Sequence, residues 1–182
     1  MIMKKVYVIN GIARVGKDTF VILCRDLLKG LFNVATYSSV DEVKQYLKEN
    51  ENWDGITKDA YWRIRMYEVK KKMIEDNNRP TRCLVESADN TPDNSIIFFH
   101  IRELEEIEKL LKLYPSAKTI HITRNNVEVI NTPVDAEPIK FSYDFTIDNS
   151  SSLEDFNLKA KNFLLAELAE HILDNQLAFS ID

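Results

Sequence analysis

Short apolar runs alternate with amphipathic stretches along the chain, and this alternation predicts the fold. Runs that are apolar at nearly every position indicate strands buried on both faces of a sheet, whereas apolar residues at helical spacing indicate amphipathic helices. The predicted strands lie at residues 6–9, 33–38, 96–99, 117–123 and 145–147. The predicted helices lie at 17–29, 58–77 and 103–113, with two more that begin near 39 and 151. Strands that alternate with helices imply an α/β fold, in which helices cover both faces of a parallel sheet.

Signals within and around these elements refine the picture. Ser39 with Glu42, and Ser151 with Glu154, have the spacing of a capping box, in which the serine caps the start of a helix. Residues 81–90 are ambiguous, with a short helix as one interpretation, and residues 125–142 show no clear period. In the helix at 58–77, Trp62, Met66, Val69 and Met73 form an apolar stripe. The three lysines 70–72 of this helix are expected on a solvated face.

The composition of the 182 residues is that of one soluble globular domain, with 45% hydrophobic and 29% charged residues. The apolar runs are far shorter than the roughly 20 residues of a membrane-spanning helix, so no membrane partner is expected. The first residues favour a buried strand over a signal peptide, and the two cysteines match no metal-binding spacing. We therefore expect a cytoplasmic protein with free thiols, as a monomer or homodimer.

A formal net charge of −5 argues against a general nucleic-acid-binding protein, which usually presents a broad basic surface. The same charge leaves room for a local cationic pocket that binds a phosphorylated small molecule. The expected partner is therefore a small molecule and not a nucleic acid.

The segment GIARVGKDTF at residues 11–20 nearly matches the phosphate-binding loop pattern G-x-x-x-x-G-K-[ST]. Gly11, Gly16 and Lys17 occupy its fixed positions between a predicted strand and a predicted helix. In such a loop the backbone N–H groups, here including those of Arg14 and Val15, point at the phosphates, and the lysine adds its charge. Two of only four glycines in the chain lie here, which favours a nucleotide site over a plain glycine turn with a solvated lysine.

Asp18 stands where the pattern has serine or threonine, and Thr19 follows one place late. A helix dipole favours a carboxylate in the first turn, but beside a polyphosphate the carboxylate needs a cation. Mg²⁺ prefers hard oxygen ligands, so Asp18 can hold it directly or through water while Thr19 bonds an inner phosphate. We therefore predict ATP and Mg²⁺ as cofactors, with Asp18 and Thr19 as the metal-site residues.

The G-K-D-T-F run resembles the loop of deoxynucleoside monophosphate kinases of the phage type, and similar G-K-D loops occur in animal phosphomevalonate kinases. In the phage-type family a middle strand ends in D-x-R, a later strand ends in arginine, and a closing segment is roughly D-x-x-I-x-N-x-x-S-L-E-E. This chain has FHIR at 99–102, HITR at 121–124 and DFTIDNSSSLED at 144–155. The matches keep the family's order along most of the chain.

The resemblance implies a single nucleoside monophosphate kinase domain, which is a three-layer P-loop NTPase fold with five parallel strands in the order 2-3-1-4-5. It implies a helical substrate-binding insertion at about 40–92 and a lid at about 125–142. The implied reaction moves the γ-phosphoryl group of ATP onto a nucleoside or deoxynucleoside monophosphate. Two alternatives stay open. One is a dephospho-coenzyme-A-kinase-like enzyme, which shares the fold and a similar closing segment, and the other is a nucleotide-binding or sensor protein with weak or no kinase activity.

Four arginines are candidates for contacts to the acceptor and to the transferring group, because guanidinium forks bind phosphate oxygens bidentately. The resemblance implies that Arg63, or else Arg65, contacts the acceptor phosphate, and that Arg102 clamps it. Arg124, at the entrance of the lid, is the candidate for covering the transferring phosphoryl group, as a catalytic partner of Lys17. The alternatives are a salt bridge from Arg102 to the glutamates that follow it, and a plain surface charge for Arg124.

Two departures from the family pattern bear on catalysis. His100 replaces the D-x-R aspartate that is expected near Mg²⁺, so that Asp18 would have to contribute more to binding the ion. The simpler interpretation is that His100 has a purely structural role. The segment 125–142 contains no arginine, whereas lids of this fold commonly carry arginines that neutralise the transferring group. An arginine at the transition state is worth on the order of 10³ in rate or more, so this lid favours the binding-protein alternative.

Overall fold

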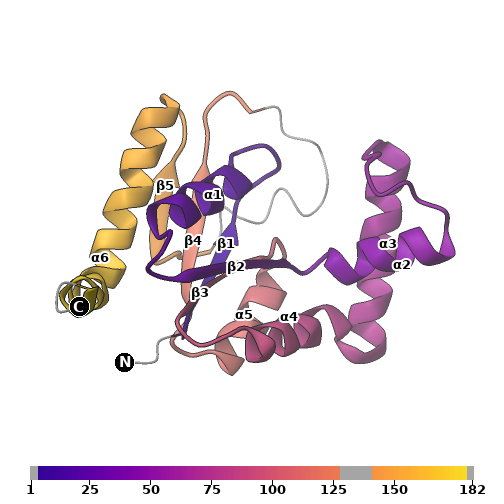
Figure 1. Cartoon of the computed structure of the whole chain (residues 1–182). Coiled ribbons are helices and arrows are strands. Elements are labelled where there is room, and N and C mark those ends of the chain that lie inside the picture. Colours follow the sequence, from indigo (N-terminus) through magenta and orange to yellow (C-terminus); the bar gives the residue numbers. More distant parts are fainter. Residues whose placement is uncertain (1–3, 128–140, 180–182) are drawn as a thin grey trace.

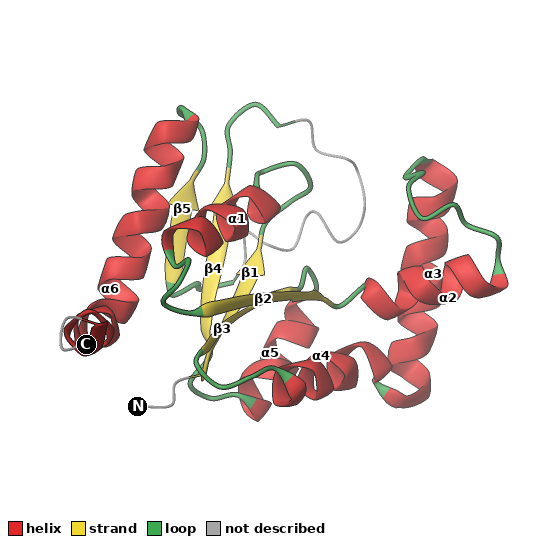
Figure 2. Ribbon diagram, viewed as in Figure 1, coloured by secondary structure: helices red, strands yellow, loops and turns green. Residues whose placement is uncertain are grey.

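Five parallel strands form the central sheet of the protein, seen in a computed structural model (Figure 1, Figure 2). The structure describes residues 4–127 and 141–179, with side chains up to residue 169. The order across the sheet is β2-β3-β1-β4-β5, which confirms the predicted α/β fold and strand order. The strands are β1 (Lys4–Asn10), β2 (Asn33–Ser38), β3 (Ser95–His100), β4 (Lys118–Thr123) and β5 (Phe145–Asp148).

Helices occupy the stretches between the strands and the end of the described chain. They are α1 (Lys17–Leu27), α2 (Asp41–Asn50), α3 (Ala60–Asn77), α4 (Arg79–Asn90), α5 (Leu104–Leu113) and α6 (Leu153–Phe179). The ambiguous stretch at 81–90 belongs to α4, which has Pro80 in its first turn, where the missing N–H costs nothing.

Residues of β1 alternate between two cores, one on each face of the sheet. Tyr7 and Ile9 pack on the face that α1 and α6 cover, whereas Val6 and Val8 pack on the face that α4 and α5 cover (Figure 2). Because successive side chains of a strand point to opposite faces, a strand covered on both sides is apolar at every position. This explains the continuous apolar runs in the sequence.

The helices α2 and α3, which lie within the predicted insertion at about 40–92, extend from the β2 edge of the sheet (Figure 1). Helix α4 lies within the same stretch of sequence but packs on the sheet. Helices α2 and α3 have a core of their own, which confirms the predicted apolar stripe of α3. Trp53 lies in this core with 3% of its surface exposed, so its ring is used for packing. The core consists of Val43, Leu47, Trp53 and Val69, with Trp62, Met66 and Met73 packed against it.

Both predicted capping boxes are wrong. Helix α2 begins without a side-chain cap, and Ser39 is instead buried, where its Oγ accepts a hydrogen bond from Lys70 Nζ at 2.8 Å. At the start of α6 the serine that accepts from a helix N–H is Ser152, which bonds the N–H of Asp155 at 3.1 Å. Where several serines follow one another, the sequence does not show which of them caps the helix. The contact between Ser39 and Lys70 joins residues far apart in the chain, so the local sequence does not predict it.

The structure also bears on the predictions made for the cysteines, for membrane-spanning helices and for the lid. Cys24 and Cys83 are free, as expected. Among the helices at residues 4–127 and 141–179, none is long and apolar enough to cross a membrane. Most of the predicted lid at 125–142 falls on residues 128–140, which lie outside the described residues.

Candidate nucleotide-binding site

The loop between β1 and α1 has a shape that only glycine permits at two positions. Gly11 has φ +139° and Gly16 has φ +103°, both in the range that side chains rarely adopt. A Cβ atom on Gly11 would clash with the carbonyl oxygen of Ile122, and one on Gly16 would clash with the amide of Asn149. The backbone conformation favours glycine at both positions, and at Gly11 the fixed backbone of Ile122 also leaves no space for a side chain.

The residues between the glycines divide between solvent and core. Arg14 also has a positive φ, +68°, and is exposed, whereas Val15 is buried in the core beneath the loop. Lys17 Nζ donates to the carbonyl oxygens of Gly11 and Ile12 at 2.6 and 2.7 Å. The ammonium group therefore lies over the loop, where a phosphate chain would meet it.

Two asparagines without a predicted role hold this loop in place. Asn10 is fully buried, accepts a hydrogen bond from the N–H of Gly11 and donates from Nδ2 to the carbonyl oxygen of Arg102 at 3.1 Å. Asn149, between β5 and α6, donates from Nδ2 to the carbonyl oxygen of Val15 at 2.8 Å. The one signal for Asn10 is a polar residue at the end of an apolar strand, directly before the first glycine.

Replacing Asn149 with alanine is expected to weaken nucleotide binding and to lower the free energy of unfolding by about 1 kcal/mol, because the bond to Val15 is lost. Calorimetric titration with a non-hydrolysable ATP analogue checks the first effect, and thermal unfolding checks the second. Asn162→Ala, at an exposed position of α6, is the matched control. Equal analogue affinity in the two variants would contradict the assigned role of Asn149.

Asp18 and Thr19 are exposed at the start of α1, at the mouth of the loop. Because Mg²⁺ binds carboxylate and hydroxyl oxygens and keeps several waters, these two side chains fit the predicted cation. His100, the last residue of β3, places Nδ1 at 3.6 Å from Asp18 Oδ1. Burial lowers the pKa of His100 to about 4, although the carboxylates of Asp18 and Asp41 act to raise it. The imidazole is therefore neutral at pH 7.

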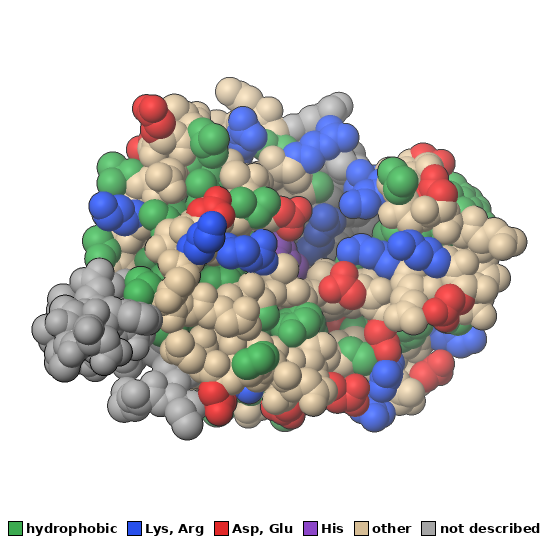
Figure 3. All heavy atoms as spheres, in the orientation of Figure 1, with side chains coloured by type: hydrophobic (Ala, Val, Ile, Leu, Met, Phe, Trp, Pro, Cys, Tyr) green, Lys and Arg blue, Asp and Glu red, His purple; other side chains and the backbone are tan. Residues whose placement is uncertain are grey.

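Two of the predicted arginines flank the loop at the carboxyl edge of the sheet. Arg102 lies two residues after β3 and Arg124 directly after β4, and both strands are neighbours of β1. Ligands of open parallel sheets bind at this edge. Figure 3 shows lysine and arginine side chains around a hollow between the sheet and the helical insertion, on a protein that is acidic overall.

The other two arginines lie near the start of α3 and differ in their partners. The Arg65 guanidinium is bound by Glu51, at 2.6 and 2.8 Å, and by Glu68, at 2.6 Å. Arg63 donates from Nε to the backbone carbonyl oxygen of Lys58 at 2.8 Å. That partner is a neutral carbonyl group, whereas two carboxylates bind the guanidinium of Arg65.

A buried ion cluster joins the insertion to the segment that follows Arg102. Lys70 of α3 has 3% of its surface exposed, so its predicted place on a solvated face is wrong. Its Nζ contacts the carboxylate of Glu103, lies 2.6 Å from Glu106 Oε2 and donates to Ser39 Oγ at 2.8 Å. Burial raises the pKa of Glu106 to about 7, against the lowering effect of Lys70. Burial acts to raise the pKa of Glu103 too, but Lys70 and hydrogen bonds lower it overall.

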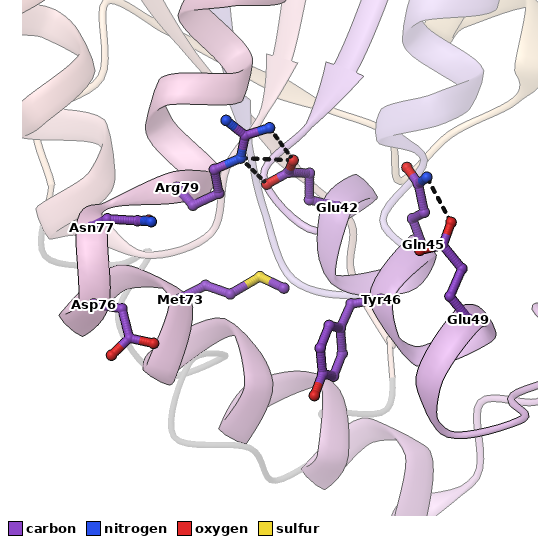
Figure 4. Close-up of a pocket in the computed structure, with 8 residues that line it drawn as sticks. All are labelled: Glu42, Gln45, Tyr46, Glu49, Met73, Asp76, Asn77 and Arg79. Atoms are coloured by element: carbon purple, nitrogen blue, oxygen red, sulfur yellow. Dashed lines mark hydrogen bonds and ion pairs between the residues drawn. The ribbon is translucent and has the colours of Figure 1, made fainter.

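A cavity of about 420 Å³ lies between α2 and the end of α3 (Figure 4). Three carboxylates line it against one guanidinium, and Arg79 is paired there with Glu42 at 2.7 Å. Carboxylates repel polyphosphates, so this cavity does not suit a nucleotide. Its lining residues are Glu42, Gln45, Tyr46, Glu49, Met73, Asp76, Asn77 and Arg79.

No protein-family model matches the sequence, and no curated protein matches it either. Solved structures do resemble it. The APS kinase CysC of Mycobacterium tuberculosis, in complex with AMPPNP and APS, matches with a TM-score of 0.53 and 12% identity over 92% of this chain and 98% of that one. A sugar kinase from Janibacter sp. HTCC2649 matches with a TM-score of 0.50 and 14% identity over 89% and 95%. This chain has the fold of the P-loop kinases. At such low identity the likeness extends to the fold alone.

Proposed function

We propose that the protein is a small-molecule P-loop kinase that transfers the γ-phosphoryl group of ATP to a nucleoside or deoxynucleoside monophosphate. The observation that carries the proposal is the loop itself. Gly11 and Gly16 both have positive φ angles that favour glycine, and Lys17 Nζ bonds the loop backbone. The solved APS kinase holds AMPPNP and APS together, which supports a fold with room for a donor and an acceptor.

Most of the candidate residues have a role in this reaction. An oxygen of the acceptor phosphate attacks the γ-phosphorus, the bond to the β–γ bridging oxygen breaks, and ADP leaves with the electron pair. Such transfer depends on positioning and positive charge more than on covalent catalysis. Lys17 and the loop N–H groups hold the ATP phosphates, Asp18 and Thr19 hold the cation, and Arg124 covers the transferring group. Arg63 and Arg102 orient the acceptor phosphate.

Substituting Arg63 or Arg102 with alanine is expected to raise the KM for the acceptor roughly tenfold to hundredfold, because a charge-assisted hydrogen bond contributes about 1.5–3 kcal/mol. The KM for ATP stays close to its original value, since neither arginine serves the ATP phosphates. Steady-state kinetics with each substrate varied in turn checks both statements. Arg82→Ala, at an exposed position of α4, is the control. Equal loss of ATP and acceptor affinity would contradict the assignment.

The acceptor class is tested by binding, since a bound ligand raises the thermal unfolding midpoint by mass action. A panel of nucleoside and deoxynucleoside monophosphates is compared with dephospho-coenzyme A, each in the presence of an ATP analogue. A shift with a monophosphate supports the proposal, and a shift with dephospho-coenzyme A alone supports a kinase of that type instead.

A nucleotide-binding or sensor protein is the second candidate. His100 in place of a carboxylate, and the lack of arginine in the sequence 125–142, favour it. Such a protein would bind the ATP analogue with no acceptor-dependent release of ADP, and Arg63→Ala and Arg102→Ala would leave its binding unchanged.

A further inference from the structure

We infer that His100 and Asp18 ligate one divalent cation together, and that this mixed nitrogen and oxygen site prefers a first-row transition cation to Mg²⁺. The inference rests on the proposed nucleotide site and specifies which ion accompanies the nucleotide there. It adds a metal ligand, His100, to the residues predicted from the sequence.

The separation of the two side chains fits a shared ion better than a direct bond. His100 Nδ1 and Asp18 Oδ1 are 3.6 Å apart, which is too long for a hydrogen bond. Two ligand atoms about 2.1 Å from one ion lie about 3.0–3.6 Å apart when the angle at the ion is about 90–120°. A cation between the two atoms would therefore need little movement of either side chain.

The two ligands come from elements that the fold holds at fixed positions. His100 is paired in the β1–β3 ladder with Ile9, which lies two residues before Gly11, and only 14% of the His100 side chain is exposed. Asp18 lies in the first turn of α1 with 94% of its side chain exposed. The imidazole is thus held by the sheet, and the carboxylate at the start of α1 is open to solvent.

The imidazole of His100 and the carboxylate of Asp18 together favour some divalent cations over others. Mg²⁺ favours oxygen ligands in near-ideal octahedral geometry and gives up its waters reluctantly. First-row transition cations bind N/O sites in the order Mn²⁺, Fe²⁺, Co²⁺, Ni²⁺ of increasing affinity, and imidazole is a suitable ligand for them. The nitrogen of His100 therefore stabilises a transition cation more than it stabilises Mg²⁺.

Pulsed EPR of Mn²⁺ tests the inference directly, because it detects the nitrogen of an imidazole bound to the ion. The full chain, labelled with ¹⁵N-histidine, is loaded with Mn²⁺ and a non-hydrolysable ATP analogue, so that ligand nitrogens of the nucleotide stay ¹⁴N. His100→Asp supplies a carboxylate in place of the imidazole. His121→Ala is the matched control, since the His121 ring stacks on Tyr143 at 4.6 Å.

We expect a ¹⁵N coupling to Mn²⁺ in the wild-type protein and in His121→Ala. In His100→Asp the coupling should be lost although Mn²⁺ stays bound. The excess of Mg²⁺ that displaces Mn²⁺ should also fall about tenfold or more in His100→Asp, since even indirect partners of a metal change its affinity by about that factor. The inference is overturned if the Mn²⁺–analogue complex binds without a histidine coupling, or if the coupling persists in His100→Asp. Either result is compatible with the proposed kinase function. Failure of the complex to bind overturns both.

Discussion

Replacing Lys17 with alanine is expected to lower acceptor-dependent turnover by about 10²- to 10³-fold, which is the usual cost of removing one positioned group that stabilises transition-state charge. Lys17 Nζ lies against the loop backbone, 2.6 Å from the carbonyl oxygen of Gly11. When phosphates occupy the loop, the ammonium group can exchange these carbonyl oxygens for phosphate oxygens without leaving the site. The measurement is the steady-state rate of ADP release with ATP and acceptor both saturating.

The control for this substitution is Lys29→Ala, because Lys29 is exposed just beyond the other end of α1. The circular dichroism spectrum of Lys17→Ala should match that of the wild-type protein, since Lys17 Nζ bonds backbone carbonyl oxygens of the loop and lies outside the core clusters. Turnover in Lys17→Ala within a few-fold of the control would contradict the placement of the ATP phosphates in this loop.

Replacing Lys70 with methionine is expected to lower the free energy of unfolding by about 3–5 kcal/mol at pH 8, because it leaves buried carboxylates without their cation. Glu106 has 2% of its surface exposed, and Lys70 Nζ lies 2.6 Å from its carboxylate. Chemical denaturation followed by circular dichroism measures the change. Lys71→Met is the matched control, because the adjacent lysine is 63% exposed and should change stability by less than about 0.5 kcal/mol.

The effect of Lys70→Met should depend on pH in a defined direction. The pKa of Glu106 is raised to about 7 by burial even with Lys70 present, and it rises further when the lysine is lost. A carboxyl whose pKa is raised in the folded state stabilises the fold below its unfolded pKa, near 4.5, and loses that contribution as the pH rises through the folded value. The variant should therefore be closer to the original protein at pH 5 than at pH 8. An equal loss at both pH values would contradict the role assigned to Glu106.

The sequence was sufficient for features that depend on local spacing. Gly11, Gly16 and Lys17 are spaced as a phosphate loop requires, and the neighbouring apolar runs place that loop between a strand and a helix. The alternation of strands and helices likewise predicts the parallel sheet, while its strand order followed from the resemblance to the kinases.

Features that depend on distant partners could not be predicted in this way. Lys70 belongs to a run of three lysines, and the partners of its buried ammonium group, Ser39, Glu103 and Glu106, lie more than thirty positions away. Arg63 and Arg65 look alike in sequence, but Glu51, fourteen positions before Arg65, binds only Arg65 among the hydrogen bonds given for the two arginines. Asparagine side chains that bond backbone groups across the fold leave no periodic signal either.

The most direct test of the proposed function is a coupled assay of ADP release with ATP, a divalent cation and a panel of nucleoside and deoxynucleoside monophosphates. Parallel reactions with Mg²⁺ and with Mn²⁺ separate the choice of cation from the choice of acceptor. The proposal predicts release that requires one of the monophosphates, yields the corresponding diphosphate and is abolished in Lys17→Ala. Binding of the ATP analogue without acceptor-dependent release across the whole panel, with either cation, would contradict it.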